Sequence, residues 1–426
     1  MEELIQYFLP NEMAFLIVFI FSFWWIWFPP LAWKFFKEMY TDYAVGNFKQ
    51  KNWDFVLLEI ILESGEAKTP KSMEKVITTL HGGRTGWGWW DINIKGAKQD
   101  MFSLEIVSIN GEIHYIIRTL KKYKKLVEGA VYGAFPDVDI QEVEDYVRNI
   151  DRSKLEIDYD VFGANIGLAK PEGYPIRTYM EFLDDDKDIK INDPMSQILE
   201  VMASLEPGEQ LWMQINIESA DDNWTQKGMK EIEKLTGQSF SDDRTILEKY
   251  VAPVMEAISF GLVAAPKPPE KPEQKFGIAQ NLTPGKAEAI KAIEHNITKP
   301  GFKCSMRYVY IAQKATYAPA SPKAFMGSLK QFNDHTLNSF KIDGKSITSE
   351  DDIFGRSKKD IERLRKNLLL DNYAKRKMKD PKFIFNTEEL TTIYHFPSSS
   401  VTTSTLKRVR SKRASAPSSL PIVDEI

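Results

Sequence analysis

The chain of 426 residues contains a single cysteine, Cys304. One cysteine excludes an internal disulfide and any zinc site built from several cysteines, and it fits a reducing compartment. The five histidines are scattered, without a His-x-x-x-His or His-Glu pair: His81, His114, His295, His335 and His395. We therefore expect neither a metal site nor a cofactor.

Catalytic motifs are missing as well. No Gly-x-x-x-x-Gly-Lys-Ser/Thr occurs, so the chain has no loop of that kind to hold nucleotide phosphates. Glu142, Glu144 and Asp145 alternate as on an exposed strand, and Cys304 falls in a predicted strand that suits the core. Nothing suggests a general acid–base pair or an activated nucleophile. The sequence favours a protein that is not an enzyme.

What the sequence does contain is an uncharged apolar run, Met13 to Trp33. As a helix, about 21 residues at about 1.5 Å each span about 31 Å, which matches a hydrocarbon core of about 30 Å. Tryptophans at its far end suit a membrane interface, and Pro29-Pro30 are expected to break or kink the helix there. A cleaved signal peptide is the alternative, but no small-x-small cleavage site follows. The predicted anchor residues are Phe15, Leu16, Ile17, Phe19, Ile20, Trp24, Trp25, Trp27 and Trp33.

The charges that flank this run predict its orientation. Upstream lie only glutamates, whereas lysines follow downstream: Lys34, Lys37, Lys49 and Lys51. The positive-inside rule then places residues 1–12 outside and the C-terminal body in the cytoplasm. We expect a single-pass protein of a bacterial inner membrane, with residues 34–54 as a juxtamembrane connector that is helical at first.

Residues 55–147 follow a β-α-β-β-α-β pattern. Asn110-Gly111 is a strong signal for a two-residue hairpin. The pattern is that of a ferredoxin-like (split βαβ) unit, a four-stranded antiparallel sheet with two helices on one face. Strands are expected at 55–62, 102–107, 113–118 and 138–146, and helices at 73–80 and 121–135.

Residues 148–345 predict a looser second unit of this kind. Its strands are expected at 155–159, 177–182, 211–218, 302–312 and 340–342, and its helices at 194–205 and 322–332. A helical insert at 220–298 interrupts it, with helices at 224–235, 243–260 and 284–296 and a proline-rich linker at 264–274. A helical segment, 346–396, and a flexible Ser/Pro/basic tail, 397–426, complete the chain. The predicted class is α+β: an N-terminal transmembrane helix, tandem ferredoxin-like units and a mobile tail.

Two stretches are candidates for contact with nucleic acid or a partner. Between His81 and Trp90, glycines and an arginine are interleaved with three tryptophans, which suits a phosphate, stacked bases or a membrane surface. The alternative is a flexible loop that packs its aromatics on the sheet or on a partner. The basic cluster in the tail predicts weak, salt-sensitive binding. The candidates are Arg84, Trp87, Trp89, Trp90, Lys407, Arg408, Arg410, Lys412 and Arg413.

A set of segments resembles one family: Thr69–Glu74, Leu80–Gly82, Phe102–Ile106, His114–Thr119, Pro136-Asp137, Glu142–Tyr146, Asn386–Leu390 and His395–Pro397. The family is a bacterial domain of unknown function. It occurs as the membrane-anchored N-terminal part of type IV secretion, conjugative DNA-transfer ATPases, and also as a stand-alone protein. In fused members the ATPase begins just past a segment similar to Ala416–Pro421, whereas this sequence stops at Ile426, either naturally or at a split gene. The motor activity of the family is therefore not carried over.

The resemblance implies a non-catalytic, membrane-anchored scaffold or docking subunit of a type IV secretion-like system. Its expected partners are the lipid bilayer, a separate P-loop ATPase and other secretion-channel subunits, and self-association into a homo-oligomer stays open. The alternative is a membrane-tethered nucleic-acid-binding accessory protein that uses the tryptophan loop and the basic tail. A membrane-bound enzyme of an unrecognised class is a third hypothesis.

Overall fold

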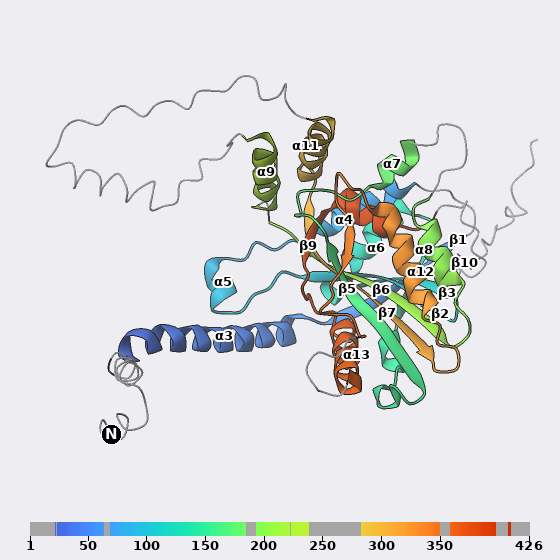
Figure 1. Ribbon diagram of the computed structural model, residues 1–426, viewed down its shortest axis with the longest axis horizontal. Coiled ribbons are helices and arrows are strands. Elements are labelled where there is room, and N and C mark those ends of the chain that lie inside the picture. The colour runs from blue at the N-terminus through green and yellow to red at the C-terminus, as the bar shows by residue number, and fades with distance from the viewer. Residues whose placement is uncertain are drawn as a thin grey trace, which may run out of the picture. The chain divides into compact units, whose positions relative to one another are not determined.

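The computed structural model describes residues 22, 24–63, 69–184, 193–221, 223–237, 283–349, 358–397 and 408–409. The chain divides into two compact units. Unit 1 comprises residues 1–54 and 84–100, and unit 2 comprises residues 55–83 and 101–426 (Figure 1). The loop that contains the three tryptophans therefore belongs with the N-terminal helix and not with the sheet.

Unit 2 is built on one large sheet that is almost entirely antiparallel (Figure 1). In its first half the strand order is β4-β1-β3-β2, and in its second half β6-β7-β5-β8. The first-half strands are β1 (Phe55–Glu63), β2 (Met101–Ile109), β3 (Glu112–Leu120) and β4 (Asp139–Val143). The second-half strands are β5 (Tyr159–Leu168), β6 (Glu209–Ser219), β7 (Gly301–Gln313) and β8 (Phe340–Ile342). The predicted mixed α+β class with an antiparallel sheet is confirmed.

The two halves meet where β2 pairs with β6, from Met101 opposite Glu218 to Ile109 opposite Gln210. The two units predicted at 55–147 and 148–345 thus share one continuous sheet. The predicted hairpin at Asn110-Gly111 is confirmed, since both residues have a positive φ and connect β2 to β3. At Gly111 a Cβ atom would lie 2.9 Å from the carbonyl oxygens of Ala203 and Leu205, which also requires glycine.

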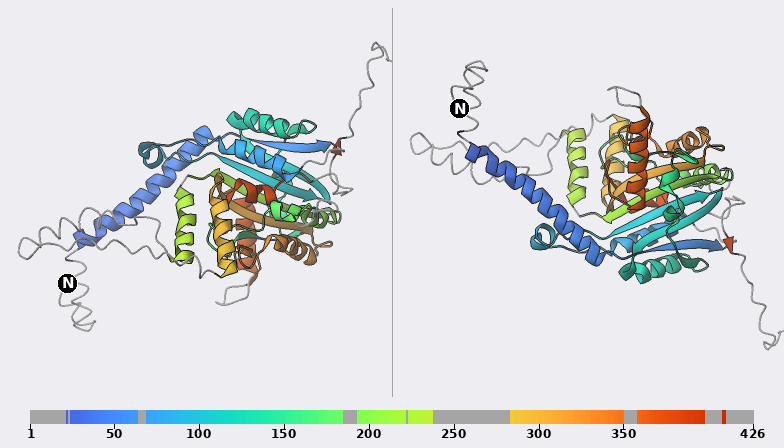
Figure 2. Two further views of the ribbon diagram at one scale, coloured as in Figure 1. Left: turned by 90° about the horizontal axis from the view of Figure 1, so that it is seen from above. Right: turned by 90° about the horizontal axis from the view of Figure 1, so that it is seen from below.

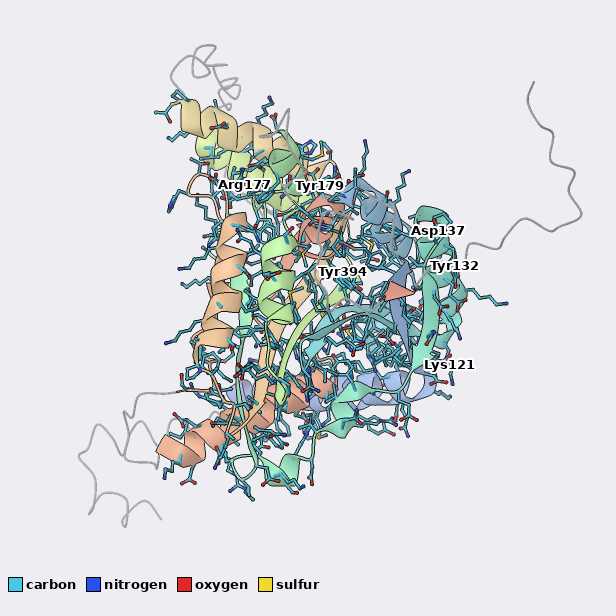
Figure 3. All side chains as sticks on the ribbon, turned by 90° about the vertical axis from the view of Figure 1, so that its right-hand side faces the viewer. Lys121, Tyr132, Asp137, Arg177, Tyr179 and Tyr394 are labelled. Carbon is cyan, nitrogen blue, oxygen red and sulfur yellow. The ribbon has the colours of Figure 1, made fainter. Side chains whose placement is uncertain are left out.

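Helices cover both faces of the sheet, because alternate residues of a strand point to opposite sides. In β1, Leu58 and Ile60 belong to the larger core and Leu57 to the smaller one. The larger core is covered by α4 (Pro70–His81), α6 (Lys124–Ala134), α8 (Ser196–Ala203), α12 (Ala320–Leu329) and α14 (Thr387–Ile393). The smaller core is covered by α13 (Lys358–Ala374). Figure 3 shows how densely side chains fill these layers, with Tyr394 inside and Tyr132 on the outer side of α6.

Several segments of unit 2 differ from prediction. The strand expected at 155–159 is instead a turn, and β5 begins only at Tyr159. Residues 177–182 form no strand; they lead into helix α7 (Tyr179–Asp184). The backbone N–H groups of Ile176 and Tyr179 donate to side chains of α14 and so have no need of a sheet partner. The segment 346–396 is not wholly helical, because β9 (Phe383–Asn386) pairs with β7. In the predicted tail, residues 408–409 form β10, parallel to β1.

The described part of the predicted insert consists of α9 (Asn223–Thr236) and α11 (Pro284–Ile297), which lie side by side (Figure 2). Gly228 allows this close packing, since a Cβ atom there would lie 2.4 Å from Cγ2 of Ile297. The helix predicted at 243–260 and the linker at 264–274 lie outside the described residues.

Unit 1 contains helix α3 (Trp24–Asn52) and the short helix α5 (Trp89–Asn93). The sequence predicts that Pro29-Pro30 break or kink the helix. The predicted break is wrong, because α3 runs through both prolines. Proline fixes φ near the helical value, so the helix continues through both residues although each lacks a backbone N–H. None of the described helices is both long and apolar enough to cross a membrane. Residues 13–21 and Phe23, which make up much of the predicted anchor, lie outside the described residues.

Candidate functional site

Helix α14 is the most polar element in the interior of unit 2, and all seven of its residues are buried. It begins with a capping box in which Asn386 accepts from the N–H of Glu389 (2.8 Å) and Glu389 accepts from the N–H of Asn386 (3.1 Å). The other carboxylate oxygen of Glu389 accepts from the N–H of Ile176 (3.1 Å). Burial raises the pKa of Glu389 to about 8. The N-cap of α14 is thus Asn386.

A cluster of charged side chains joins α14 to its neighbours. Lys299 Nζ lies 2.6 Å from a carboxylate oxygen of Glu74 in α4 and 2.6 Å from one of Glu388 in α14. His295 Nε2 in α11 lies 3.0 Å from the same oxygen of Glu388. Burial by itself would raise the pKa of Glu388, but hydrogen bonds from Lys299, Thr178 and His295 outweigh it and hold that pKa below its usual value.

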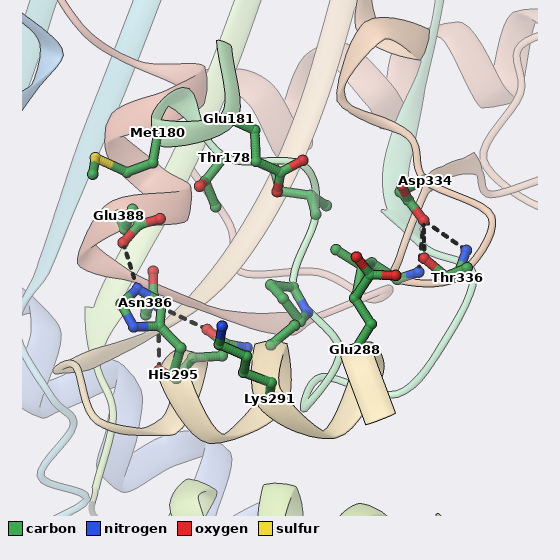
Figure 4. A pocket seen from close by; sticks show the side chains of 15 residues that line it. Thr178, Met180, Glu181, Glu288, Lys291, His295, Asp334, Thr336, Asn386 and Glu388 are labelled. Atoms are coloured by element: carbon green, nitrogen blue, oxygen red, sulfur yellow. Dashed lines mark hydrogen bonds and ion pairs between the residues drawn. The ribbon is translucent and has the colours of Figure 1, made fainter. Parts of the chain in front are cut away.

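Glu388 and His295 of this cluster line one end of a cavity of about 510 Å³ (Figure 4). Figure 4 shows Glu388 and His295 at one end and Asp334 with Thr336 at the other. Asp334 is held by its own loop, because its Oδ1 accepts from the N–H groups of Thr336 (2.6 Å) and Leu337 (2.9 Å). Most of the solvent-accessible surface of this cavity is apolar, and acidic side chains stand around it. Glu388 joins α14 to α11 and, through Lys299, to α4, whereas Asp334 stabilises its own loop, so both carboxylates are held in place.

A second buried charged cluster lies on the other face of the sheet. Arg376 donates from Nε to Oε1 of Glu105 (3.0 Å) and from Nη2 to Oε2 (3.2 Å), and both side chains are fully buried. Arg376 Nη2 also donates to Asp145 Oδ1 (3.0 Å). Although burial acts to raise the pKa of Glu105, the charge of Arg376 lowers it to about 2. Asp145, predicted on an exposed strand, instead follows β4 and holds the end of α13.

Unit 1 presents a different surface, which is apolar and exposed. Large side chains at three- and four-residue spacing lie on one side of α3; we call them the α3 stripe: Trp33, Phe36, Met39, Tyr40 and Tyr43. Trp33, the last residue of the uncharged run, is 73% exposed. Helix α5 adds Trp89 and Trp90, which are 70% and 61% exposed, and Ile92.

The loop that carries α5 is fixed to α3 at three points. Tyr40 Oη donates to the carbonyl oxygen of Ile94 (3.0 Å). The rings of Phe48 and Trp87 meet edge to face, with centroids 5.5 Å apart. Gly96 has φ +68°, and a Cβ atom there would lie 2.3 Å from the carbonyl carbon of Ala44. The α3 stripe and α5 therefore belong to one structural unit.

The comparison with protein families matches a domain of unknown function, DUF8128, over residues 57–408. The chain belongs to this family. The match runs from β1 to the first residue of β10 and so includes every strand of the DUF8128 sheet. No curated protein matches the chain.

In this DUF8128 chain, the candidates for nucleic-acid or partner contact fall into two groups, one in the tryptophan loop of unit 1 and one near the C-terminus. Trp87 packs on Phe48 of α3. Trp89 and Trp90 are exposed beside it, and Arg84 begins the same loop. Arg408 lies in β10 of unit 2, whereas Lys407, Arg410, Lys412 and Arg413 lie outside the described residues.

The predicted anchor residues are described only in part. Trp24, Trp25 and Trp27 form the first turn of α3, and Trp33 opens the α3 stripe. Phe15, Leu16, Ile17, Phe19 and Ile20 lie outside the described residues. In the ranges that the structure covers, no group of three or more His, Cys, Asp or Glu side chains is arranged to hold a metal ion.

Neither charged cluster could be predicted from the sequence. Their members come from distant parts of the chain: Glu105 and Arg376 are 271 residues apart, and Glu74 and Lys299 are 225 apart. The one local pattern near either cluster is the sequence Asn386-Thr387-Glu388-Glu389, which is typical of a capping box and predicts the start of a helix. It gives no indication that the helix is buried.

Proposed function

We propose that this DUF8128 chain is a membrane-bound docking subunit, without catalysis of its own, of a type IV secretion-like (conjugative DNA-transfer) machine. It works beside a separate P-loop ATPase. Residues 13–33 form its single transmembrane helix in a bacterial inner membrane, and unit 2 lies in the cytoplasm. The two halves of the sheet are tandem copies of a ferredoxin-like unit.

The exposed apolar surface of unit 1 carries the membrane part of this proposal. The α3 stripe begins at Trp33, where the uncharged run ends, and continues to Tyr43. Tryptophan and tyrosine gather at membrane interfaces because each combines an apolar ring with a polar tip. Exposed apolar patches on a folded protein commonly mark a membrane or a partner surface.

The docking part rests on the resemblance to the N-terminal, non-motor part of the fused ATPases. Two of the resembling segments, Asn386–Leu390 and His395–Pro397, form α14 and the chain that follows it. The cavity beside α14 offers a partner a recess whose acidic groups are held in place by Lys299 and by backbone N–H groups.

Membrane extraction tests the membrane part of the proposal. Full-length protein is expected in the membrane pellet after an alkaline carbonate wash and in solution only after detergent. Phe19→Asp with Ile20→Asp should move it to the soluble fraction, because each charge at the centre of a membrane helix costs about 3 kcal/mol. The control, Ile157→Asp at an exposed site of unit 2, should leave it in the pellet. Release of the unaltered chain by carbonate alone would refute the anchor.

A nucleic-acid-binding accessory protein is the second candidate. The observation that favours it is the exposure of Trp89 and Trp90 on a loop that also contains Arg84, Lys95 and Lys98. Bases stack on such rings while cations follow the backbone. This function predicts salt-dependent binding of single-stranded DNA by the full-length chain. Arg84→Ala combined with Trp89→Ala should abolish it.

A further inference from the structure

In helix α5 the apolar side chains are exposed to solvent, whereas the polar side chains bond to other groups of the same loop. Asp91 pairs with Lys95 (2.8 Å), and Asn93 Nδ2 donates to the carbonyl oxygen of Trp89 (2.9 Å). Trp89 and Trp90 are left facing outward. The exposed apolar side chains of this helix, Trp89, Trp90 and Ile92, form a patch of the kind that marks a membrane or partner surface; we call it the α5 wedge.

The contacts between the loop and α3 determine the position of the wedge along that helix. Its contacts reach from Tyr40 to Phe48. Tyr40 follows Trp33 by about two helical turns, or about 10 Å at about 1.5 Å per residue. The headgroup layer extends about 5–8 Å beyond the hydrocarbon on each side. On an upright helix Tyr40 would therefore lie about 2–5 Å beyond this layer, and the average tilt of membrane helices, about 20°, brings a loop on one side of α3 closer to the lipid surface.

We infer that α5 is a second membrane contact, which inserts Trp89, Trp90 and Ile92 into the interfacial layer of an anionic phospholipid bilayer. The inference rests on the proposed membrane attachment of residues 13–33. The sequence of this loop is compatible with stacking on bases, insertion at a membrane and packing on a partner, and its structure favours lipid for the reasons that follow.

The chemistry of the surface favours lipid as the occupant. The indole groups of Trp89 and Trp90 match the interfacial layer, where the ring is buried and the N–H stays hydrated. Exposed lysines on the same unit complement anionic headgroups, at Lys34 and Lys37 on α3 and at Lys98 on the loop, whereas Lys95 is already paired with Asp91. Glu38 and Asp42 on α3 offset part of this charge, so the apolar side chains provide most of the attraction.

A single-cysteine label tests the wedge directly. The native Cys304 is fully buried and burial raises the pKa of its thiol, so it stays unlabelled in the folded protein. Trp90→Cys is labelled with an environment-sensitive fluorophore, and full-length protein is reconstituted into phosphatidylcholine–phosphatidylglycerol vesicles. The matched control is Ile157→Cys, which is 69% exposed in unit 2. We expect blue-shifted emission at position 90, most of it lost to lipids with a quencher near the headgroup, and little change at position 157.

The outcomes separate this inference from the proposed function. If the protein floats with the vesicles but the label at position 90 keeps its aqueous emission, the wedge is refuted and the anchor stands. Protein that does not float refutes the proposed anchor and the wedge together. A label that is shielded only by a second copy, a protein partner or single-stranded DNA, without quenching by lipid, also overturns the inference.

Discussion

Replacing Arg376 with methionine should destabilise unit 2 strongly. The guanidinium makes two hydrogen bonds to Glu105 and reaches Asp145, and neither Arg376 nor Glu105 is exposed to solvent. Methionine keeps much of the volume but leaves the carboxylate of Glu105 buried without the cation that is hydrogen-bonded to it. Breaking a buried ion pair from one side costs about 3–5 kcal/mol. We expect a loss of about 4 kcal/mol in the free energy of unfolding.

Urea unfolding followed by tryptophan fluorescence measures this loss. Trp212 is a suitable probe, because its ring lies 5.0 Å from that of Tyr146 and 5.3 Å from that of Tyr373, beside the cluster. The control is Arg363→Met at an exposed position of α13, for which we expect a change within about 0.5 kcal/mol. An equal effect of Arg376→Met and Arg363→Met would refute the reasoning.

The same cluster predicts a pH dependence with a definite sign. The pKa of Glu105 is about 2 in the folded state and 4.5 as an ordinary glutamate. Because the folded state lowers this pKa, the stabilisation is fully present above pH 4.5 and is lost as the pH falls towards 2. The shift corresponds to about 3 kcal/mol. In Arg376→Met the free energy of unfolding should depend less on pH between 4.5 and 2. A variant that loses stability with falling pH as steeply as the unaltered chain would contradict the role given to Glu105 and Arg376.

Three further predictions concern single sites. Gly163→Ala should lower the free energy of unfolding in urea by about 2 kcal/mol, because the added Cβ atom would lie 2.3 Å from the carbonyl oxygen of Tyr308. The matched control, Gly327→Ala, adds a Cβ atom in open space on α12 and should raise that free energy by about 0.5 kcal/mol. Cys304 should react with a thiol reagent at pH 8 only after unfolding, since burial raises its pKa; rapid reaction of native protein would contradict this. Asn386→Ala should lower the stability by about 1–2 kcal/mol through loss of the α14 cap, and an unchanged urea midpoint would count against that role.

Local patterns predicted much of the first half of the sheet. The alternation in β2 and β3 and the turn chemistry of Asn110-Gly111 are encoded within a few residues, so the hairpin follows from them. The apolar spacing of Met73, Val76, Ile77 and Leu80 likewise marks the buried side of α4.

Distant contacts explain what the sequence did not reveal. The N–H groups of Ile176 and Tyr179 are taken by Glu389 and Thr392, each 213 residues away, so a strand-like stretch leads into α7. The pairing of β2 with β6 and the joining of β9 to β7 are also non-local. At the candidate site, no local pattern indicates which tryptophan of the loop packs on Phe48 and which stay exposed.

Affinity purification of the full-length chain from detergent-solubilised native membranes, with mass spectrometry of the proteins that come with it, tests the docking role most directly. The proposed function predicts a stoichiometric P-loop ATPase, together with other subunits of a secretion channel. A chain that purifies alone and monodisperse at low salt, without an ATPase, would contradict it.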